Sequence, residues 1–346
     1  MMTTDARHSE MESGGYYNAH SRPQGSASEL GIPLLERAAR EVPLDGSALQ
    51  IADLGSSQGK NSMLPMRAAI AAVRARSADL TIAITHTDLA SNDFTALFEL
   101  LQSSPLSYLS GATNVYAYAA GSSFYGRLFP ADTLHLGWNS IAVHWLSAVP
   151  CAIPNHIWSP YAQGEVRDAF RARAAQDWNT FLEARSAELR NAAELVVVAS
   201  SADDKGFAGA EGLMNVANEE LLAMVRRRRI GADRYDAMAI PTYYRTRAEF
   251  EAPFTASSSL ELLESIPQVL DDPYWPEYER THDAQAFAAS YTAFFRAFSE
   301  PCLFGEAGGP VADEFYAGVQ SRIAADPAAA VCRWQLLLLR ARRRPR

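Results

Sequence analysis

The chain has 346 residues, of which 48% are hydrophobic and 21% charged, a globular composition that excludes the disordered and fibrous classes. Its formal net charge of −9 argues against general nucleic-acid binding, and its apolar runs are shorter than the ~20 residues that a membrane helix needs. The start lacks the basic-then-apolar pattern of a secretory signal, and three widely spaced cysteines are typical of a reducing compartment, so we expect a cytoplasmic protein.

Apolar, strand-like runs alternate with helical patterns in the first part of the chain. We predict strands at 48–55, 79–90, 113–121, 132–140 and 194–200, and a helix over 62–76 that follows the first strand. Strands separated by helices imply a mostly parallel sheet with helices on both faces. The expected fold class is therefore α/β.

Helical patterns dominate the later part of the chain. An apolar stripe at helical spacing predicts a long helix over 164–191, and further helices are expected over 211–229 and 281–299. Strand patterns return at 254–267 and 329–342. The late helices therefore look like insertions that form a cap on an α/β core.

This pattern predicts a division of the chain. We expect a core at 1–205, a helical cap at 206–253 and 268–328, and two late strands, 254–267 and 329–342, that return to the core sheet. Within the core, residues 138–150 form a candidate substrate segment. The basic runs at 226–229 and 340–346 are assigned to a helix end and to a solvated tail.

The stretch "IADLGSSQGKNS" (51–62) is the most informative on chemical grounds. Asp53 and Gly55 follow an apolar strand, Gly59 completes a tight turn, and a helix begins near Ser62. Glycines let the backbone approach a ligand, and a helix N-terminus offers unpaired N–H groups to an anion. The spacing D-x-G-x-x-x-G suits a methyltransferase turn better than the G-x-G-x-x-G of nicotinamide enzymes, and a glycine turn without a ligand is the alternative.

Asp88 ends the second predicted strand. An acidic side chain there can accept hydrogen bonds from both hydroxyls of a ribose, or it can cap a helix.

The motifs of other enzyme classes are missing, since the sequence has no G-x-S-x-G, H-E-x-x-H or G-x-x-x-x-G-K-[ST]. The seven histidines show no metal-ligand spacing, so we expect no metal.

Six motifs, in order along nearly the whole chain, resemble those of the SABATH methyltransferases, which methylate carboxylic acids or xanthine alkaloids with S-adenosylmethionine. They are "MESGGYYNAHSRPQ" (11–24), "ADLGSSQGKN" (52–61), "TDLASNDF" (87–94), "SSFYGRLFP" (122–130), "HWLSAVP" (144–150) and "AIPTYYRT" (239–246). The resemblance implies a Rossmann-like methyltransferase core with a helical cap, S-adenosylmethionine as cofactor, a small carboxylic acid as substrate and a homodimer. The chain departs from the usual pattern at His20, Ser56 and Lys60, and we expect a non-plant, bacterial member.

The resemblance also implies roles for single residues. The cofactor contacts are Tyr17 and Ser21 at the methionine or sulfonium end, Asp53, Gly55 and Asn61 at the amino-acid portion, Asp88 at the ribose, and Leu89, Ser123 and Phe124 at the adenine. Gln24 and Trp145 match the pair that holds a substrate carboxylate through a side-chain amide and an indole N–H. The further substrate contacts are Ile141, His144, Met214 and Tyr243, with Ile141 standing where plant carboxyl methyltransferases commonly have a tyrosine.

A carboxylate with a pKa of about 4 is ionised at pH 7, so its methylation needs no general base and depends on alignment and desolvation. The carboxylate follows from Gln24 paired with Trp145, and an aromatic ring follows from a pocket expected to gather Trp138, His144, Trp145 and Tyr243, unless these side chains merely form core. We therefore predict O-methylation of a small aromatic acid of the benzoate, salicylate or anthranilate kind. The alternative acids are indole acetate or an isoprenoid acid. The alternative reaction is N-methylation of a xanthine-like heterocycle with His144 as base. The non-enzyme alternative is a catalytically silent regulatory protein that binds the cofactor.

Overall fold

The computed structural model describes residues 11–46, 48–305 and 309–345, so residues 1–10, on which the secretory-signal prediction partly rests, lie outside it. The described strands form one sheet in the order β3-β2-β1-β4-β5-β7-β6. They are β1 (Leu49–Leu54), β2 (Ile82–Asp88), β3 (Val115–Gly121), β4 (Leu134–Ser140), β5 (Leu189–Ser200), β6 (Leu260–Asp271) and β7 (Arg333–Arg343). Strands β1 to β5 pair in parallel, while β7 is antiparallel to β5 and β6. The predicted mostly parallel α/β sheet is confirmed.

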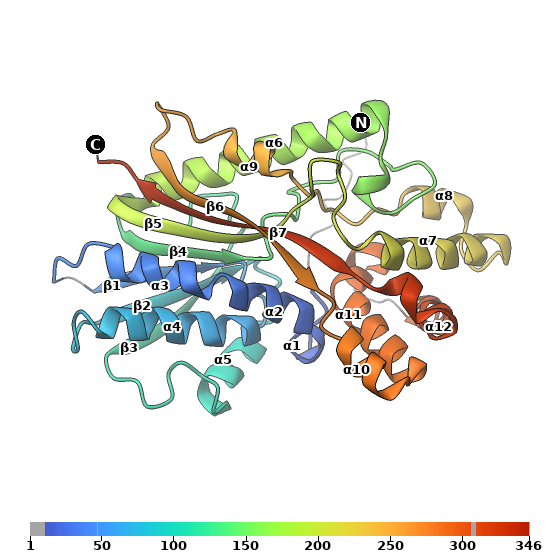
Figure 1. Ribbon diagram of the computed structural model, residues 1–346, viewed down its shortest axis with the longest axis horizontal. Coiled ribbons are helices and arrows are strands. Elements are labelled where there is room, and N and C mark those ends of the chain that lie inside the picture. The colour runs from blue at the N-terminus through green and yellow to red at the C-terminus, as the bar shows by residue number, and fades with distance from the viewer. Residues whose placement is uncertain (1–10, 47, 306–308, 346) are drawn as a thin grey trace.

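Helices cover both faces of this sheet and gather beyond one end of it (Figure 1). They are α1 (Tyr16–His20), α2 (Arg22–Leu30), α3 (Ile32–Glu41), α4 (Met63–Arg74), α5 (Phe94–Ser103), α6 (Gly164–Glu188), α7 (Glu211–Arg226), α8 (Ala232–Asp236), α9 (Arg247–Glu251), α10 (Trp275–Thr281), α11 (Ala284–Phe304) and α12 (Gly309–Ala325). In Figure 1, α3 and α4 lie on one side of the sheet and α6 on the other, with α7, α10, α11 and α12 together at the right.

The central strands are apolar on both faces because helices bury both. In β5, Val196 and Val198 point into a cluster with residues of α3 and α4, whereas Leu195 and Val197 point into a cluster with Phe181 of α6. This alternation follows from the two-residue period of a strand. A separate core joins α7, α11 and α12 through apolar side chains such as Leu221, Phe295 and Phe315. These helices form the expected cap.

Several element bounds differ from the predicted ones. The strand expected over 254–267 runs from Leu260 to Asp271, because residues 255–258 form a turn closed by the Ser258 N–H bond to the Thr255 carbonyl at 3.1 Å. Pro267 does not end this strand, since β6 is the edge of the sheet and an edge residue needs no donor on its outer side.

Two helices also differ from the prediction. The long helix predicted over 164–191 ends at Glu188, because β5 begins at the next residue. Helix α9, expected within the cap, packs Phe250 against Trp178 of the sheet-covering α6, with ring centroids 5.2 Å apart.

The basic tail is largely a buried part of the sheet, which corrects the expectation of a solvated end. Strand β7 continues to Arg343, and Arg340 is 5% exposed. The Arg340 guanidinium pairs with Glu194 at 2.7 Å and with Glu264 at 3.0 Å. These partners lie on the two strands that flank β7, so cross-strand neighbours of opposite charge hold the segment in register.

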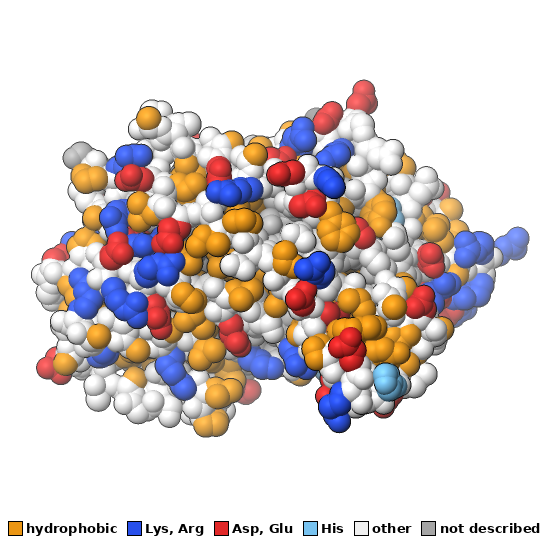
Figure 2. All heavy atoms as spheres, viewed as in Figure 1, with side chains coloured by type: hydrophobic (Ala, Val, Ile, Leu, Met, Phe, Trp, Pro, Cys, Tyr) orange, Lys and Arg blue, Asp and Glu red, His pale blue; other side chains and the backbone are white. Residues whose placement is uncertain are grey.

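The described surface carries mixed charges. Figure 2 shows Lys and Arg side chains gathered at the outer end of α7, and the basic run 226–229 follows that helix end as expected. Two of its arginines have acidic partners, Arg227 with Glu220 at 2.6 Å and Arg229 with Glu314 at 2.7 Å. Within the described ranges, no helix is long and apolar enough to cross a membrane. The homodimer and the cytoplasmic location stay predictions.

Candidate active site

Two adjoining cavities lie at the carboxyl ends of β1, β2 and β4, where parallel sheets of this kind bind ligands. The first, which we call the sheet cavity, is lined by residues such as Asp53, Asp88 and Phe124. The second, the cap cavity, lies between the sheet and the cap and is lined by residues such as Met214 and Phe298. Five residues line both cavities: Met11, Tyr17, Gln24, Ile141 and Trp145.

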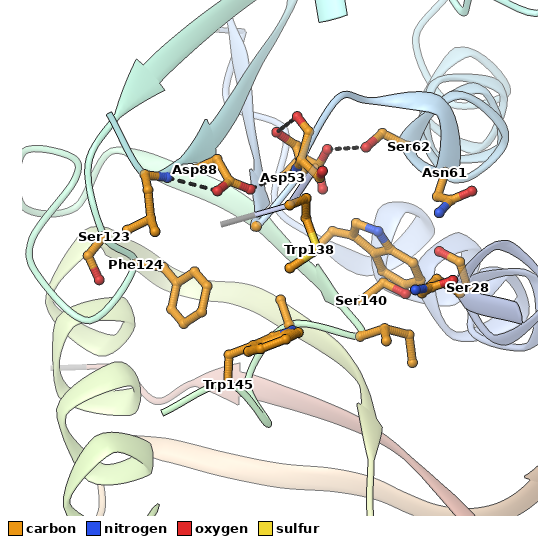
Figure 3. A pocket seen from close by; sticks show the side chains of 18 of the residues that line it. Ser28, Asp53, Asn61, Ser62, Asp88, Ser123, Phe124, Trp138, Ser140 and Trp145 are labelled. Atoms are coloured by element: carbon orange, nitrogen blue, oxygen red, sulfur yellow. Dashed lines mark hydrogen bonds between the residues drawn. The ribbon is translucent and has the colours of Figure 1, made fainter. Parts of the chain in front are cut away.

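The close view of the sheet cavity shows an elongated arrangement (Figure 3). Asp88, Ser123 and Phe124 lie at one end, and Asn61 and Ser28 lie at the other. Trp145 lies on the side toward the cap cavity, which it also lines. The cavity therefore suits a long ligand whose middle portion faces Trp145.

Glycines shape the loop after β1. Gly55 and Gly59 adopt left-handed backbone with φ of +85° and +87°, which glycine reaches without steric cost. A Cβ on Gly55 would lie 2.6 Å from the Cβ of Ala142, so any other residue would crowd the cavity. The N–H of Gly55 donates to the Thr87 carbonyl at 2.8 Å, which fastens the loop to the end of β2.

Asp88 organises the same loop. Its two carboxylate oxygens accept the backbone N–H groups of Ser57 at 2.7 Å and Leu89 at 2.8 Å. A carboxylate has about four acceptor positions, so Asp88 can accept hydrogen bonds from ligand hydroxyls as well as from the backbone. The alternative role of helix cap belongs to Asp93, whose carboxylate accepts the Ala96 N–H at 3.0 Å at the start of α5. Leu89 lines the cavity beside Asp88.

A buried chain of polar side chains supports Asp53. One carboxylate oxygen of Asp53 accepts the Ser62 hydroxyl at 2.5 Å and lies 2.8 Å from His86 Nδ1. The other ring nitrogen of His86 lies 2.8 Å from the Tyr108 hydroxyl, and burial raises the Tyr108 pKa. His86 and Tyr108 are not among the residues predicted from the sequence. A histidine inside an otherwise apolar strand is the signal that could have indicated a buried partner.

The aromatic loop over 122–130 forms the far wall of the sheet cavity. Ser123 and Phe124 line it, and the Phe124 ring stands edge-on to Phe181 with centroids 5.8 Å apart. Arg185 of α6 donates to the Phe124 carbonyl at 2.9 Å and pairs with the fully buried Glu188 at 2.8 Å. This ion pair fixes the loop in place from behind.

The segment over residues 11–24 covers both cavities. Its Asn18 donates to the Gln58 carbonyl at 2.9 Å, which ties it to the glycine loop. Ser21 is 1% exposed and accepts a hydrogen bond from Asn61 at 3.1 Å, so it orients Asn61 and is not among the lining residues. Tyr17 does line both cavities, as does Gln24.

Trp145 is held firmly by its backbone. The Tyr125 hydroxyl donates to its carbonyl at 2.5 Å, and buried Arg245 donates to the carbonyl of Val143 at 2.6 Å. The indole ring meets Phe298 of the cap edge-on, with centroids 6.2 Å apart. These contacts fix the direction of its N–H group. That N–H has no hydrogen-bond partner among the described residues.

The cap cavity does not receive Tyr243, which corrects that expectation. Thr242 pairs with Trp145 in an antiparallel bridge, so successive side chains of this extended segment face opposite sides. Thr242 and Tyr244 line the cap cavity, whereas the Tyr243 hydroxyl bonds Glu249 at 2.9 Å and faces a separate surface cavity. Met214, Ile141 and His144, the other predicted substrate contacts, line the cap cavity.

Two residues that line the cap cavity with Trp145 have unusual properties: the pKa of His144 is low, and the backbone of Ile141 is left-handed. Burial, and secondarily the charge of Arg245, lowers the pKa of His144 to about 3, so its ring is neutral at pH 7. Ile141 has φ +51°, a left-handed backbone that is strained for a β-branched residue at a cost of about 1–3 kcal/mol. The strained backbone places Ile141 where the two cavities meet, and such strain is concentrated at functional sites.

Further lining residues escaped the sequence analysis. In the sheet cavity they include Ser28 and Tyr125. Trp138 and Ser140, which belong to the candidate substrate segment 138–150, line the sheet cavity as well, and Trp138 is 1% exposed. The hydroxyls of Ser28 and Ser140 are buried without a partner in the described structure and are available to a ligand. Ser28 follows Gln24 by four residues on α2, a spacing that places both on one helix face.

A model of the family described as SAM-dependent carboxyl methyltransferase matches residues 7–342. The methyltransferase FUS9 of Gibberella moniliformis is 26% identical over 247 residues, 69% of this chain and 65% of that protein. Caffeine synthase 1 of Camellia taliensis is 25% identical over 323 residues, 87% of this chain and 86% of that protein. The structure of loganic acid methyltransferase with SAH has a TM-score of 0.81 and 20% identity, covering 97% of this chain and 99% of that one, a likeness of fold. Because the family model spans nearly the whole sequence, the chain belongs to the S-adenosylmethionine-dependent carboxyl methyltransferase (SABATH) family.

Proposed function

We propose that the protein methylates the carboxylate of a small aromatic acid of the benzoate, salicylate or anthranilate kind. The observation that carries this proposal is the placement of Gln24 and Trp145 where the two cavities meet. The Gln24 amide has a buried oxygen without a partner, and neither its NH₂ nor the Trp145 N–H is engaged among the described residues. Two unengaged neutral donors at this point suit one oxygen of a carboxylate, whose other oxygen then faces the sheet cavity.

The sheet cavity fits the family's cofactor, S-adenosylmethionine. We assign the ribose to Asp88, the adenine to Leu89, Ser123 and Phe124, and the amino-acid portion to Asp53, Gly55 and Asn61. The supporting observations are the anionic acceptor at the end of β2, the apolar wall at Phe124 and the space that a Cβ at Gly55 would fill. When bound, S-adenosylmethionine supplies an activated methyl group that a nucleophilic oxygen can take by in-line displacement.

The protein must orient the acid without lowering the nucleophilicity of its carboxylate. Among the described residues, no lysine or arginine lines either cavity. A cationic clamp would stabilise the ground-state carboxylate more than the transition state and would slow the transfer. Neutral donors from Gln24 and Trp145 fix the geometry at a smaller cost to reactivity. Apolar residues such as Met214, Phe294 and Phe298 exclude water from the acid.

The state of His144 favours the acid over a xanthine-like heterocycle. N-methylation of a neutral ring N–H requires a proton acceptor, and His144 was the available candidate base. With a pKa of about 3, His144 is a weak base at pH 7. A carboxylate is already ionised and does not need one. Although the chain is similar to caffeine synthase 1, the weak basicity of His144 therefore favours carboxyl methylation over N-methylation.

A turnover assay tests the proposal. With labelled S-adenosylmethionine and equal concentrations of benzoate, salicylate, anthranilate, indole acetate, an isoprenoid acid and a xanthine, we expect methyl ester from at least one of the first three. Ester from indole acetate or the isoprenoid acid alone would replace the substrate class. Methylated xanthine without any ester would contradict carboxyl methylation. No product, in a protein that binds the cofactor, would indicate the silent regulatory protein.

The dependence on pH and metals gives a second test. We expect kcat/KM to stay flat from about pH 6.5 to 8.5, because an acid with a pKa of about 4 is ionised throughout this range. His144, with a pKa of about 3, is likewise neutral throughout. Activity should survive a chelator, and the described residues contain no cluster of metal-ligand type. A bell-shaped profile centred near pH 7, or collapse with chelator, would contradict this mechanism.

A further inference from the structure

The wall of the cap cavity carries polar groups that the proposed carboxylate contacts do not use. His144, 6% exposed, has its buried Nδ1 without a hydrogen-bond partner in the described structure. Thr242, 1% exposed, has no described partner with normal hydrogen-bond geometry at its buried Oγ1, and the Tyr244 hydroxyl is the polar group that interacts with it. Ser200, at the end of β5, is 7% exposed, and its hydroxyl likewise makes no hydrogen bond to a described residue. All three line the cap cavity.

These three side chains come together because their backbones are neighbours. The Tyr243 N–H donates to the His144 carbonyl at 2.9 Å, and Thr242 forms a bridge with Trp145. The same segment then runs beside the end of β5, where Ala202 N–H donates to the Arg245 carbonyl at 3.0 Å. The extended segment therefore joins the His144–Trp145 backbone at Thr242 and Tyr243, and joins the chain just after β5 at Arg245 and Thr246.

The His144 ring is fixed although its nitrogens are not engaged. It stacks on Tyr244 with centroids 5.7 Å apart and an interplanar angle of 26°, and it lies 5.6 Å from the Trp145 ring. A group in contact with His144 therefore lies about one ring width from the site that we assign to the carboxylate. Aromatic contacts hold the imidazole in place, so its polar atoms are oriented before any ligand arrives.

Leaving such groups unpaired is costly in a cavity that is otherwise apolar. A buried donor or acceptor without a partner destabilises a protein by about 1–3 kcal/mol, and such groups are rare in native structures. Each of the three can serve a hydroxyl or a carbonyl, because a neutral imidazole offers one donor and one acceptor and a hydroxyl offers both. No Asp, Glu, Lys or Arg is among the residues that line the cap cavity, so a second charged group would lack a partner.

We infer that the substrate acid carries an uncharged hydrogen-bonding substituent, a hydroxyl or keto group, remote from its carboxylate and bound by His144, Ser200 and Thr242. This inference rests on the proposed function. It excludes unsubstituted benzoate as the preferred acid. It also disfavours salicylate, whose hydroxyl is adjacent to the carboxylate and bonds it internally. The preferred aromatic acid has its hydroxyl at the meta or para position.

Paired substrates test the inference. We expect the wild-type protein to methylate 3- or 4-hydroxybenzoate with a kcat/KM at least about tenfold above those of benzoate and salicylate, since a site built for a hydroxyl rejects the analogue that lacks it. His144→Phe, which keeps a ring, and the near-isosteric Thr242→Val should each bring the ratio of hydroxybenzoate to benzoate to within about threefold. Ser200→Ala should lower the ratio as well. Trp178→Phe, a change on the α6 side of the sheet that touches neither cavity, should keep it.

Calorimetric binding of S-adenosylhomocysteine to every variant establishes that its sheet cavity is intact. Equal turnover of benzoate and both hydroxybenzoates by the wild type would overturn the inference while leaving carboxyl methylation in place. A preference that persists undiminished in all three polar variants would overturn the assigned residues. If the wild type binds S-adenosylhomocysteine but methylates none of the four acids, the proposed function fails, and the inference fails with it.

Discussion

Replacement of Asp88 by alanine will weaken the binding of S-adenosylhomocysteine by about 100-fold or more, equivalent to about 3 kcal/mol. The reason is twofold. We assign the two ribose hydroxyls to this carboxylate, and hydrogen bonds to a charged acceptor contribute about 1.5–3 kcal/mol each. The same carboxylate also holds the Ser57 and Leu89 N–H groups, so its loss loosens the loop that shapes the cavity. Isothermal titration calorimetry measures the change directly.

Asp283→Ala is the matched control. Asp283 caps α11 by accepting the Gln285 and Ala286 N–H groups, and it does not line the sheet cavity. Its replacement should lower the thermal stability while leaving the Kd of S-adenosylhomocysteine within about threefold, because a lost cap costs about 1 kcal/mol of folding free energy. Asp88→Asn, which keeps the size and loses the charge, should fall between wild type and Asp88→Ala. An unchanged Kd in Asp88→Ala would remove Asp88 from the binding site.

Trp145→Phe will lower kcat/KM for the preferred acid by about 10–100-fold, or about 1–3 kcal/mol, while the affinity for S-adenosylhomocysteine changes far less. The phenyl ring retains most of the apolar contact with Phe298 and deletes the N–H that we assign to the carboxylate. Gln24→Glu should lower kcat/KM more than Gln24→Leu does. Both changes remove the amide donor, and the glutamate adds a second carboxylate that repels the carboxylate of the substrate.

Trp178→Phe provides the control for this experiment. The Trp178 indole N–H donates to the Phe250 carbonyl at 3.0 Å on the α6 side of the sheet, away from both cavities. We expect this variant to lose stability and to retain kcat/KM within about threefold, since its lost N–H does not face the substrate. Full activity of Trp145→Phe toward the acid would refute its role as a carboxylate donor.

The sequence predicted the sheet half of the site better than the cap half. Asp53, Gly55 and Asp88 could be found because each stands at the end of an apolar strand, where local pattern and topology together fix the position. Their supporting partners could not, since the His86–Tyr108 contact joins residues 22 positions apart that no local pattern connects.

The cap half depends on details that a single sequence leaves open. Choosing Tyr244 rather than Tyr243 as the lining residue requires the phase of one short extended segment, and a shift of one residue reverses which side chain faces the cavity. The buried arginine in β7 was missed for a related reason, because a basic run usually lies at the surface unless acidic cross-strand partners such as Glu194 accompany it.

The segment over residues 11–24 has a kinetic consequence. Its backbone joins the cap through the Glu12 N–H bond to the Ala297 carbonyl at 2.9 Å and joins the core through the Gly14 N–H bond to Asp93 at 3.0 Å. Met11, Tyr17 and Gln24 of this one segment contact both cavities, so each ligand stabilises the cover over the other. By linkage, the acid raises the affinity for the cofactor by the same factor by which the cofactor raises the affinity for the acid. At unchanged association rates, the residence time of each ligand lengthens by that factor. If both products leave by displacement of this segment, the rate of that displacement sets an upper limit on kcat even when methyl transfer is fast.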